Sequence, residues 1–267
     1  MILIIENKRY IFLFFLIGFT LMLFGCGAQT YILKNNPDNN KKEYVVVLHG
    51  LFVNSFYMHS LARVLAEDGY EVINISYPST KHTLEDLSKF VEQEIKKHVT
   101  HEERKVNFVG YSLGGVVLRT VLKNYHPQNM GRVVHIGTPN KGSEVADRYK
   151  DNKLFLWMFG PVIKQVVTNQ EHVKHLFGPV DYELGIIASK KSYNRLFSKL
   201  FKNDHDGIVS VESAILEGAK ESYIVDATHE FMPFNQDIIN QTLSFIRDGH
   251  FAKKNNIIQL RDKLVLS

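Results

Sequence analysis

From residue 44 onward, short apolar runs alternate with longer segments whose apolar side chains recur at helical spacing. The run Tyr44–Leu48 is continuous and rich in β-branched residues, which is typical of a strand buried on both faces of a sheet. On the same criteria we expect strands over 44–48, 71–76, 105–109, 132–136, 185–189 and 222–225, and helices over 57–68, 83–98, 113–124 and 237–247. This order predicts a mostly parallel sheet of about six strands with helices on both faces.

One interruption of this alternation lies between residues 140 and 183, which contain no clear strand. Within it, residues 151–180 include an unbroken apolar run from Leu154 to Phe159. An apolar run outside the sheet predicts a lid, or the wall of a pocket that receives an apolar group. The alternative interpretation is a helix that packs on the core.

The length and charge of the chain indicate how many domains it forms and what kind of partner it binds. A chain of 267 residues with 45% hydrophobic residues suits one α/β domain, which we place at 44–250 and follow with a C-terminal tail at 251–267. The net charge of +4 comes from 32 basic and 28 acidic residues, with no long basic cluster. This balance argues against a nucleic-acid partner and leaves a small molecule or a lipid as the expected partner.

The first 25 residues differ from the rest of the chain. Lys8 and Arg9 precede an apolar run from Tyr10 to Phe24, and Gly25 follows it. This order predicts a secretory signal peptide over 1–25. The run is shorter than the roughly 20 apolar residues of a comfortable membrane span. The apolar residues 2–5, which precede the charges, leave a signal anchor as an alternative.

The single cysteine, Cys26, stands directly after this run. The segment 23–26 resembles the bacterial lipoprotein signal, in which the cysteine is lipidated and becomes the first residue, although Phe24 departs from the small residue usual there. An incidental cysteine is the alternative. Residues 29–43 are polar and rich in asparagine, so we predict a lipidated cysteine and flexible tether over 26–43. We therefore expect an exported, membrane-anchored lipoprotein of the bacterial cell envelope, or alternatively a secreted or signal-anchored protein.

The segment 110–114, Gly-Tyr-Ser-Leu-Gly, fits the pattern G-x-S-x-G and stands between a predicted strand and a predicted helix. In this pattern the serine sits on a sharp turn that exposes its hydroxyl, and larger side chains two positions away would collide with neighbouring elements. A helix that begins there also directs free backbone N–H groups toward a developing oxyanion. The pattern predicts Ser112 as a nucleophile, with Gly110 and Gly114 forming its turn.

A serine nucleophile needs a base, and the base needs a carboxylate to orient it. His229 lies in the loop between the last predicted strand and the last predicted helix, where this type of fold places its base. For the acid, Asp206 precedes Gly207, which permits a tight turn. Asp204 remains the alternative. Asp226 is closer to His229 in sequence but lies at a strand end, and we interpret it as a surface carboxylate.

The oxyanion of the reaction needs two N–H donors, one from the residue after the nucleophile and one from the loop after the first core strand. These positions are Leu113 and Leu51. His49 precedes Gly50 in the same loop, and we interpret it as a brace for the loop rather than a chemical group.

Together these segments resemble bacterial lipases and esterases of the α/β-hydrolase superfamily, over residues 44 to about 247. The segments that carry the resemblance are 49–52, 110–115, 137–143, 206–209 and His229. In such lipases the acid precedes a glycine and the histidine follows some twenty residues later, so the resemblance favours Asp206 over Asp204. Triacylglycerol lipases of this kind often bind calcium, but no acidic cluster surrounds Glu230, so we predict no metal and no cofactor.

The resemblance implies an α/β-hydrolase fold with a lid-like insertion and a serine carboxylic ester hydrolase, an esterase or lipase that acts on an ester with an apolar acyl group. An acyltransferase or thioesterase with the same three side chains is an alternative within enzymes. A non-catalytic binding lipoprotein on a hydrolase scaffold is an alternative of another class. The presence of Ser112, Asp206 and His229 together argues against that last alternative.

Overall fold

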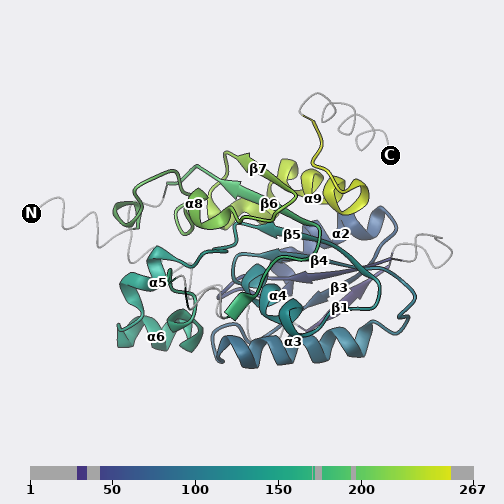
Figure 1. Ribbon diagram of the computed structural model, residues 1–267, viewed down its shortest axis with the longest axis horizontal. Coiled ribbons are helices and arrows are strands. Elements are labelled where there is room, and N and C mark those ends of the chain that lie inside the picture. Colours follow the sequence, from purple (N-terminus) through teal and green to yellow (C-terminus); the bar gives the residue numbers. More distant parts are fainter. Residues whose placement is uncertain (1–28, 35–42, 170, 172–175, 194–196, 254–267) are drawn as a thin grey trace, which may run out of the picture.

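The structure is a computed structural model that describes residues 29–34, 43–169, 171, 176–193 and 197–253 (Figure 1). Its centre is a seven-stranded sheet in the order β1-β3-β2-β4-β5-β6-β7. The strands are β1 (Tyr31–Leu33), β2 (Tyr44–Leu48), β3 (Glu71–Ile75), β4 (Val106–Tyr111), β5 (Met130–Ile136), β6 (Leu184–Ser189) and β7 (Glu221–Val225). All neighbouring strands pair in parallel except β1, which is antiparallel to β3. The predicted α/β architecture, a mostly parallel sheet with helices on both faces, is confirmed.

Helices cover both faces of this sheet (Figure 1). The α-helices are α2 (His59–Glu67), α3 (Leu84–His98), α4 (Leu113–Asn124), α5 (Glu144–Tyr149), α6 (Lys153–Phe159), α8 (Val211–Ala214) and α9 (Gln236–Asp248). Short 3₁₀ helices are η1 (Ser55–Met58), η2 (Pro161–Lys164), η3 (Ser198–Leu200) and η4 (His229–Phe234). The long helices lie where the apolar spacing predicts them, and Thr83 caps α3 by accepting a hydrogen bond from the Asp86 N–H.

The two faces of the sheet have separate hydrophobic cores, and β2 contributes to both. Tyr44, Val46 and Leu48 point into the core shared with α3 and α4, whereas Val45 and Val47 point into the core shared with α2 and α9. All five side chains are fully buried. This two-sided burial is the physical reason why the strand is continuously apolar rather than alternating.

The order of the strands creates a switch point between β2 and β4. From β2 the chain crosses through α2 to β3 on one side, and then through α3 to β4 on the other side of β2. The loops that leave the carboxyl ends of β2 and β4 therefore diverge, and ligands of open α/β sheets bind in the crevice at such a point. Residues 49–54 and Ser112 are the segments that leave those two strand ends.

The polar segment before residue 44 contains a strand that the sequence pattern did not predict. Tyr31–Leu33 pairs with β3, so the prediction of a flexible tether over 26–43 is wrong for these residues. The Tyr31 hydroxyl donates to the Ser55 carbonyl at 3.1 Å and accepts from the Asn74 amide at 2.9 Å. These partly buried polar contacts hold a strand of three residues, which is too short to be recognised by its hydrophobic pattern.

Several predictions of the sequence pattern lie outside the described residues: the signal peptide at 1–25, the lipidated Cys26, most of the tether and the tail beyond residue 253. In the part of the chain that is described, no helix is long and apolar enough to cross a membrane.

The insertion between residues 140 and 183 is built from short helices at the carboxyl end of the sheet, where Figure 1 shows α5 and α6. Its far end is tied to the helix that follows Ser112. The Arg119 guanidinium of α4 donates to the Asn140 carbonyl at 2.6 Å and to the Gly178 carbonyl at 3.3 Å, and it lies over the Phe177 ring. In contrast, α6 has no buried residue.

The contacts of Tyr31 predict a local stability effect. Tyr31→Phe removes a donor to Ser55 and leaves the Asn74 amide with one partner fewer, which should cost about 1 kcal/mol of unfolding free energy. Denaturant unfolding measures that loss, and amide hydrogen exchange should become faster in β1 and its partner β3 but not in β6. Unchanged exchange in β1 would contradict this account of how the edge strand is held.

Candidate active site

Ser112 is the single residue between β4 and α4, and its backbone has a conformation that residues other than glycine rarely adopt. Its backbone has φ 53° and ψ −121°, in the region that favours glycine. Its N–H donates to the Ile136 carbonyl of β5 at 2.8 Å, which fixes the turn to the neighbouring strand. The strained backbone therefore presents the Ser112 side chain at the carboxyl end of the sheet, as a nucleophile requires.

The glycines on either side of Ser112 are needed because other backbone lies against them. A Cβ on Gly110 would lie 2.5 Å from the Gly115 Cα atom. A Cβ on Gly114 would lie 2.5 Å from the Leu48 carbonyl oxygen at the end of β2. Only glycine lets α4 begin this close to the sheet, which is the steric reason for the G-x-S-x-G spacing.

Three side chains from distant parts of the chain form one line of hydrogen bonds. His229 Nε2 lies 2.9 Å from Ser112 Oγ, and His229 Nδ1 lies 2.7 Å from Asp206 Oδ2. All three side chains are buried or nearly so. With Nδ1 donating to the carboxylate, Nε2 is left as an acceptor for the serine proton, which is the tautomer that a general base needs.

The turn after β6 orients the carboxylate. Asp206 Oδ1 accepts from the backbone N–H groups of Ile208 and Val209 at 2.9 and 2.8 Å, which leaves Oδ2 for the histidine. Gly207 has φ 108°, so it makes the turn that the sequence suggested. The other candidate carboxylates, Asp204 and Asp226, are exposed to solvent. Of these three carboxylates, the structure brings Asp206 to His229.

The pKa of His229 is raised above its ordinary value of 6.5. Burial alone would lower it, because desolvation disfavours the imidazolium ion. The negative charge of Asp206 and the hydrogen bond to it outweigh that effect, and Glu230 adds a smaller contribution in the same direction. The site therefore stabilises the protonated histidine that forms when the serine proton is transferred.

Two tyrosine hydroxyls hold the backbone of the loop that carries the histidine. The Tyr111 hydroxyl donates to the His229 carbonyl at 2.9 Å, and the Tyr57 hydroxyl donates to the Glu230 carbonyl. Tyr111 directly precedes Ser112, so one residue connects the nucleophile turn to the base loop. The sequence pattern identifies neither residue, since the position between Gly110 and Ser112 tolerates many side chains and gives no signal of a contact 118 residues away.

The predicted oxyanion donors, Leu51 and Leu113, belong to the two chain segments next to Ser112. Leu113 is the first residue of α4, so its N–H has no acceptor one turn earlier in the helix. The loop after β2 passes directly over the nucleophile, because a Cβ on Gly50 would lie 3.2 Å from Ser112 Cβ. The N–H of Leu51 follows at the next position.

His49 braces this loop, as predicted. Its Nε2 accepts from the Tyr77 N–H at 3.1 Å, its Nδ1 lies 2.8 Å from the Gly50 carbonyl, and its ring stacks on Tyr77. Burial lowers the pKa of His49 to about 4, so the ring is neutral and can both donate and accept. Its nitrogens are thus fully used in holding the loop.

Aromatic side chains connect the loop after β2 to the insertion. The ring centroids of Phe52 and Phe159 are 5.4 Å apart, and those of Phe159 and Phe155 are 4.4 Å apart. The α6 side chains Phe155, Leu156 and Phe159 pack against the same core as Leu51. The insertion therefore forms an apolar wall next to the predicted oxyanion donors.

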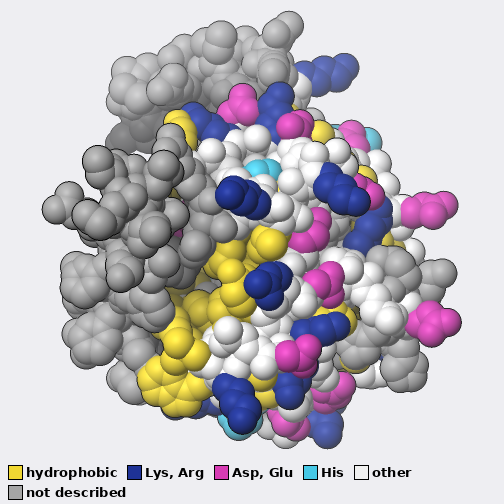
Figure 2. All heavy atoms as spheres, turned by 90° about the vertical axis from the view of Figure 1, so that its left-hand side faces the viewer, with side chains coloured by type: hydrophobic (Ala, Val, Ile, Leu, Met, Phe, Trp, Pro, Cys, Tyr) yellow, Lys and Arg dark blue, Asp and Glu magenta, His cyan; other side chains and the backbone are white. Residues whose placement is uncertain are grey.

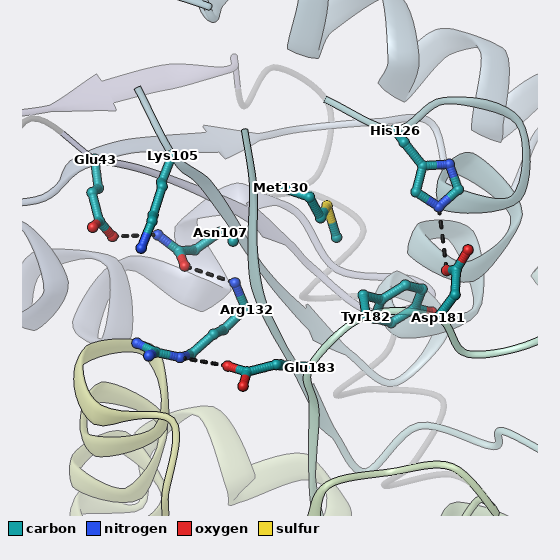
Figure 3. A pocket seen from close by; sticks show the side chains of 10 residues that line it. Glu43, Lys105, Asn107, His126, Met130, Arg132, Asp181, Tyr182 and Glu183 are labelled. Atoms are coloured by element: carbon teal, nitrogen blue, oxygen red, sulfur yellow. Dashed lines mark hydrogen bonds and ion pairs between the residues drawn. The ribbon is translucent and has the colours of Figure 1, made fainter. Parts of the chain in front are cut away.

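A cavity of about 280 Å³ opens at the opposite edge of the sheet (Figure 3). Several of its polar side chains pair with one another: Asn107 with Glu43, Arg132 with Glu183, and His126 with Asp181 (Figure 3). It lies at the amino ends of β4 and β5, whereas Ser112 follows the carboxyl end of β4. Within the described residues, no group of histidine, cysteine or acidic side chains is placed to hold a metal ion.

Known proteins resemble this chain in sequence and in fold. Over 126 residues it is 27% identical to a triacylglycerol lipase of Vibrio cholerae, a match that covers 45% of this chain and 40% of that lipase. Among solved structures, the mature lipase of Bacillus licheniformis superposes with a TM-score of 0.63 at 20% identity, covering 82% of this chain and 96% of that one. A carboxyl esterase from a metagenome superposes with a TM-score of 0.57 at 18% identity, covering 71% and 65%.

These structural likenesses establish the fold. A family model described as the alpha/beta hydrolase fold matches residues 43–264, which is most of the chain. This protein therefore belongs to the alpha/beta hydrolase fold family.

Proposed function

We propose that this protein is a serine carboxylic ester hydrolase, an esterase or lipase. The observation that carries the proposal is the continuous hydrogen-bonded line from Asp206 through His229 to Ser112. Each member of this line has the partner that its role requires, and the line ends at a side chain on a strained turn. Groups that share these features catalyse acyl transfer on several unrelated folds.

In the proposed reaction, Ser112 Oγ attacks the ester carbonyl carbon while His229 Nε2 takes its proton. The carbonyl oxygen becomes an oxyanion, which accepts hydrogen bonds from the N–H groups of Leu51 and Leu113. Collapse of this intermediate breaks the bond to the alcohol, and His229 gives its proton to the departing oxygen. Water then attacks the acyl-serine with His229 again as base, releasing the acid and restoring Ser112.

The acyl group of the substrate is proposed to be apolar. The wall beside the oxyanion donors consists of Phe52, Phe155 and Phe159, which offer contact to hydrocarbon and no charge to bind a polar group. The names of the similar proteins, a triacylglycerol lipase and a carboxyl esterase, support an ester as substrate. We propose no metal or cofactor in the reaction.

We also propose that the protein is exported and held at a membrane by its N-terminal segment. The support is the sequence pattern: Lys8 and Arg9, the apolar run 10–24, and Cys26 directly after it. Either a lipidated Cys26 or an uncleaved signal anchor would hold the domain at a lipid surface.

Hydrolysis of p-nitrophenyl esters with acyl chains of two to sixteen carbons should detect the activity, and the best chain length separates an esterase from a lipase. Ser112→Ala should lower kcat by about 10⁴-fold or more, because the nucleophile is lost while the fold is kept. A fluorophosphonate probe should label the natural protein and not the variant. A folded protein that neither hydrolyses an ester nor reacts with the probe would favour a binding module.

The pH dependence of kcat/KM should report the raised pKa of His229. The base must be neutral to accept a proton, so activity should fall as the pH drops through that pKa, with the midpoint above 6.5. Asp206→Asn removes the charge that raises the pKa, so the midpoint should move to lower pH as kcat falls by about 10⁴-fold. A midpoint that stays in place in this variant would contradict the assignment of Asp206.

Tyr111→Phe should lower kcat by roughly tenfold with little change in KM, because the base loop loses a backbone contact that places His229. The matched control is Tyr223→Phe, which removes a hydroxyl whose hydrogen bond goes to Asp237 of α9 and not to the loop that carries His229. Steady-state kinetics and thermal unfolding of both variants separate positioning from stability. Equal loss of kcat in the two variants would argue against a specific role for Tyr111.

A further inference from the structure

The antiparallel strand β1 decides at which edge of the sheet the chain enters the domain. Tyr31 pairs with Asn74 near the carboxyl end of β3, and Leu33 pairs with Val72 near its amino end. Gln29 and Thr30, which precede Tyr31, therefore lie at the carboxyl edge of the parallel strands. This is the edge from which Ser112 and the loop carrying His229 also leave.

The entering segment is fixed to that edge up to Gln29. The Ser55 hydroxyl donates to the Gln29 carbonyl at 3.1 Å, and the Ser76 N–H donates to the Thr30 hydroxyl at 3.3 Å. Cys26 is three residues before Gln29, and three residues of chain span at most about 11 Å. An anchor at Cys26, or an apolar segment ending just before it, must therefore lie close to η1.

Exposed apolar side chains gather at the same edge. They come from η1, from η4 and from α6, and their exposed fractions are 74% for Phe56, 68% for Phe231, 47% for Phe234, 60% for Leu154 and 78% for Trp157. The first two helices touch, because the Tyr57 ring packs edge-on against Phe234 at 4.8 Å. α6 lies beside the loop after β2, which leads into η1, because Phe159 contacts Phe52.

Figure 2 looks onto this edge of the sheet and shows hydrophobic side chains gathered on it, with lysine and arginine side chains beside them and acidic side chains among these. Lys153 directly precedes Leu154 on α6. Lys81 follows Thr80, whose backbone packs against Gly160, and Lys164 ends η2, the short helix directly after Gly160. All three lysines are exposed. An apolar surface bordered by cations is suited to the interface of an anionic bilayer.

We propose that the face made by Phe56, Phe231, Phe234, Leu154 and Trp157 docks on the bilayer that holds the N-terminal segment, so that the catalytic edge faces the lipid. The inference rests on the membrane anchoring proposed above and does not require that Ser112 be catalytic. The occupant is a lipid surface because the 28 residues before Gln29 include the apolar run 10–24 and reach the domain at this face. A domain anchored there has its exposed aromatic side chains within reach of the lipid.

The chain carries its own probe for this test, because Trp157 is its only tryptophan. The experiment uses the full chain with Ser112→Ala, reconstituted in vesicles of phosphatidylcholine and phosphatidylglycerol with or without brominated acyl chains. Bromine quenches nearby indole rings. We expect brominated lipid to remove about half of the Trp157 fluorescence, since side chains docked at an interface lie about 5–10 Å deep in it.

Two relocated tryptophans complete the design. Trp157→Phe with Phe231→Trp moves the probe to η4, and we expect similar quenching there. Trp157→Phe with His101→Trp moves it to the exposed loop that leads into the amino end of β4, at the opposite edge, and we expect no quenching. Leu154→Asp, which adds a carboxylate beside Trp157, should reduce the quenching of Trp157 and leave flotation with the vesicles unchanged.

The outcomes separate the anchoring from the docking. A full chain that does not float with vesicles overturns both. A chain that floats while the indoles at 157 and 231 are unquenched, or are quenched no more than the one at 101, overturns the docking alone. Quenching at 157 and 231 without quenching at 101 supports it. Ester hydrolysis by the protein with Ser112 intact tests the proposed function separately, because a water-soluble short-chain ester needs no docked enzyme.

Discussion

The strained backbone of Ser112 is the constraint on which the site depends. A residue with a side chain at positive φ costs of order 1–3 kcal/mol, and the surrounding structure must hold it there. The hydrogen bond from its N–H to Ile136 and the close contacts of Gly110 and Gly114 do so. The position of Ser112 Oγ is therefore set by the packing of α4 on the sheet. Because rigid elements hold this turn on both sides, the Ser112 side chain occupies one defined position.

His229 and Asp206 reach that position through backbone contacts as much as through side chains. The His229 N–H donates to the Asp206 carbonyl at 3.1 Å, so the two loops are joined by a backbone hydrogen bond as well as by their side chains. The hydroxyl of Tyr111 then ties the His229 loop back to the nucleophile strand. Burying a carboxylate and an imidazole costs free energy, and here each ring nitrogen and each carboxylate oxygen named above has a partner that offsets it.

What the sequence could predict follows from the range of the contacts involved. The buried strands, Ser112 and Asp206 were predictable, because β-branched runs, paired glycines and an Asp-Gly turn are local requirements of the backbone. β1 was not, because Tyr31–Leu33 is short and is held by hydroxyl and amide contacts with Ser55 and Asn74 that no local pattern encodes. The role of Tyr111 was hidden for the same reason: its partner is 118 residues away.

The direction of β1 determines where the N-terminal segment lies relative to the edge of the sheet that carries Ser112. In a parallel sheet every strand begins at one edge and ends at the other, so a parallel first strand would bring the N-terminal segment to the edge opposite Ser112. Pairing Tyr31–Leu33 antiparallel to β3 reverses this and places Gln29 beside η1, where Tyr57 already contacts the loop after His229. A three-residue strand thus determines whether a domain anchored as proposed would hold the edge that carries Ser112 toward the lipid or away from it.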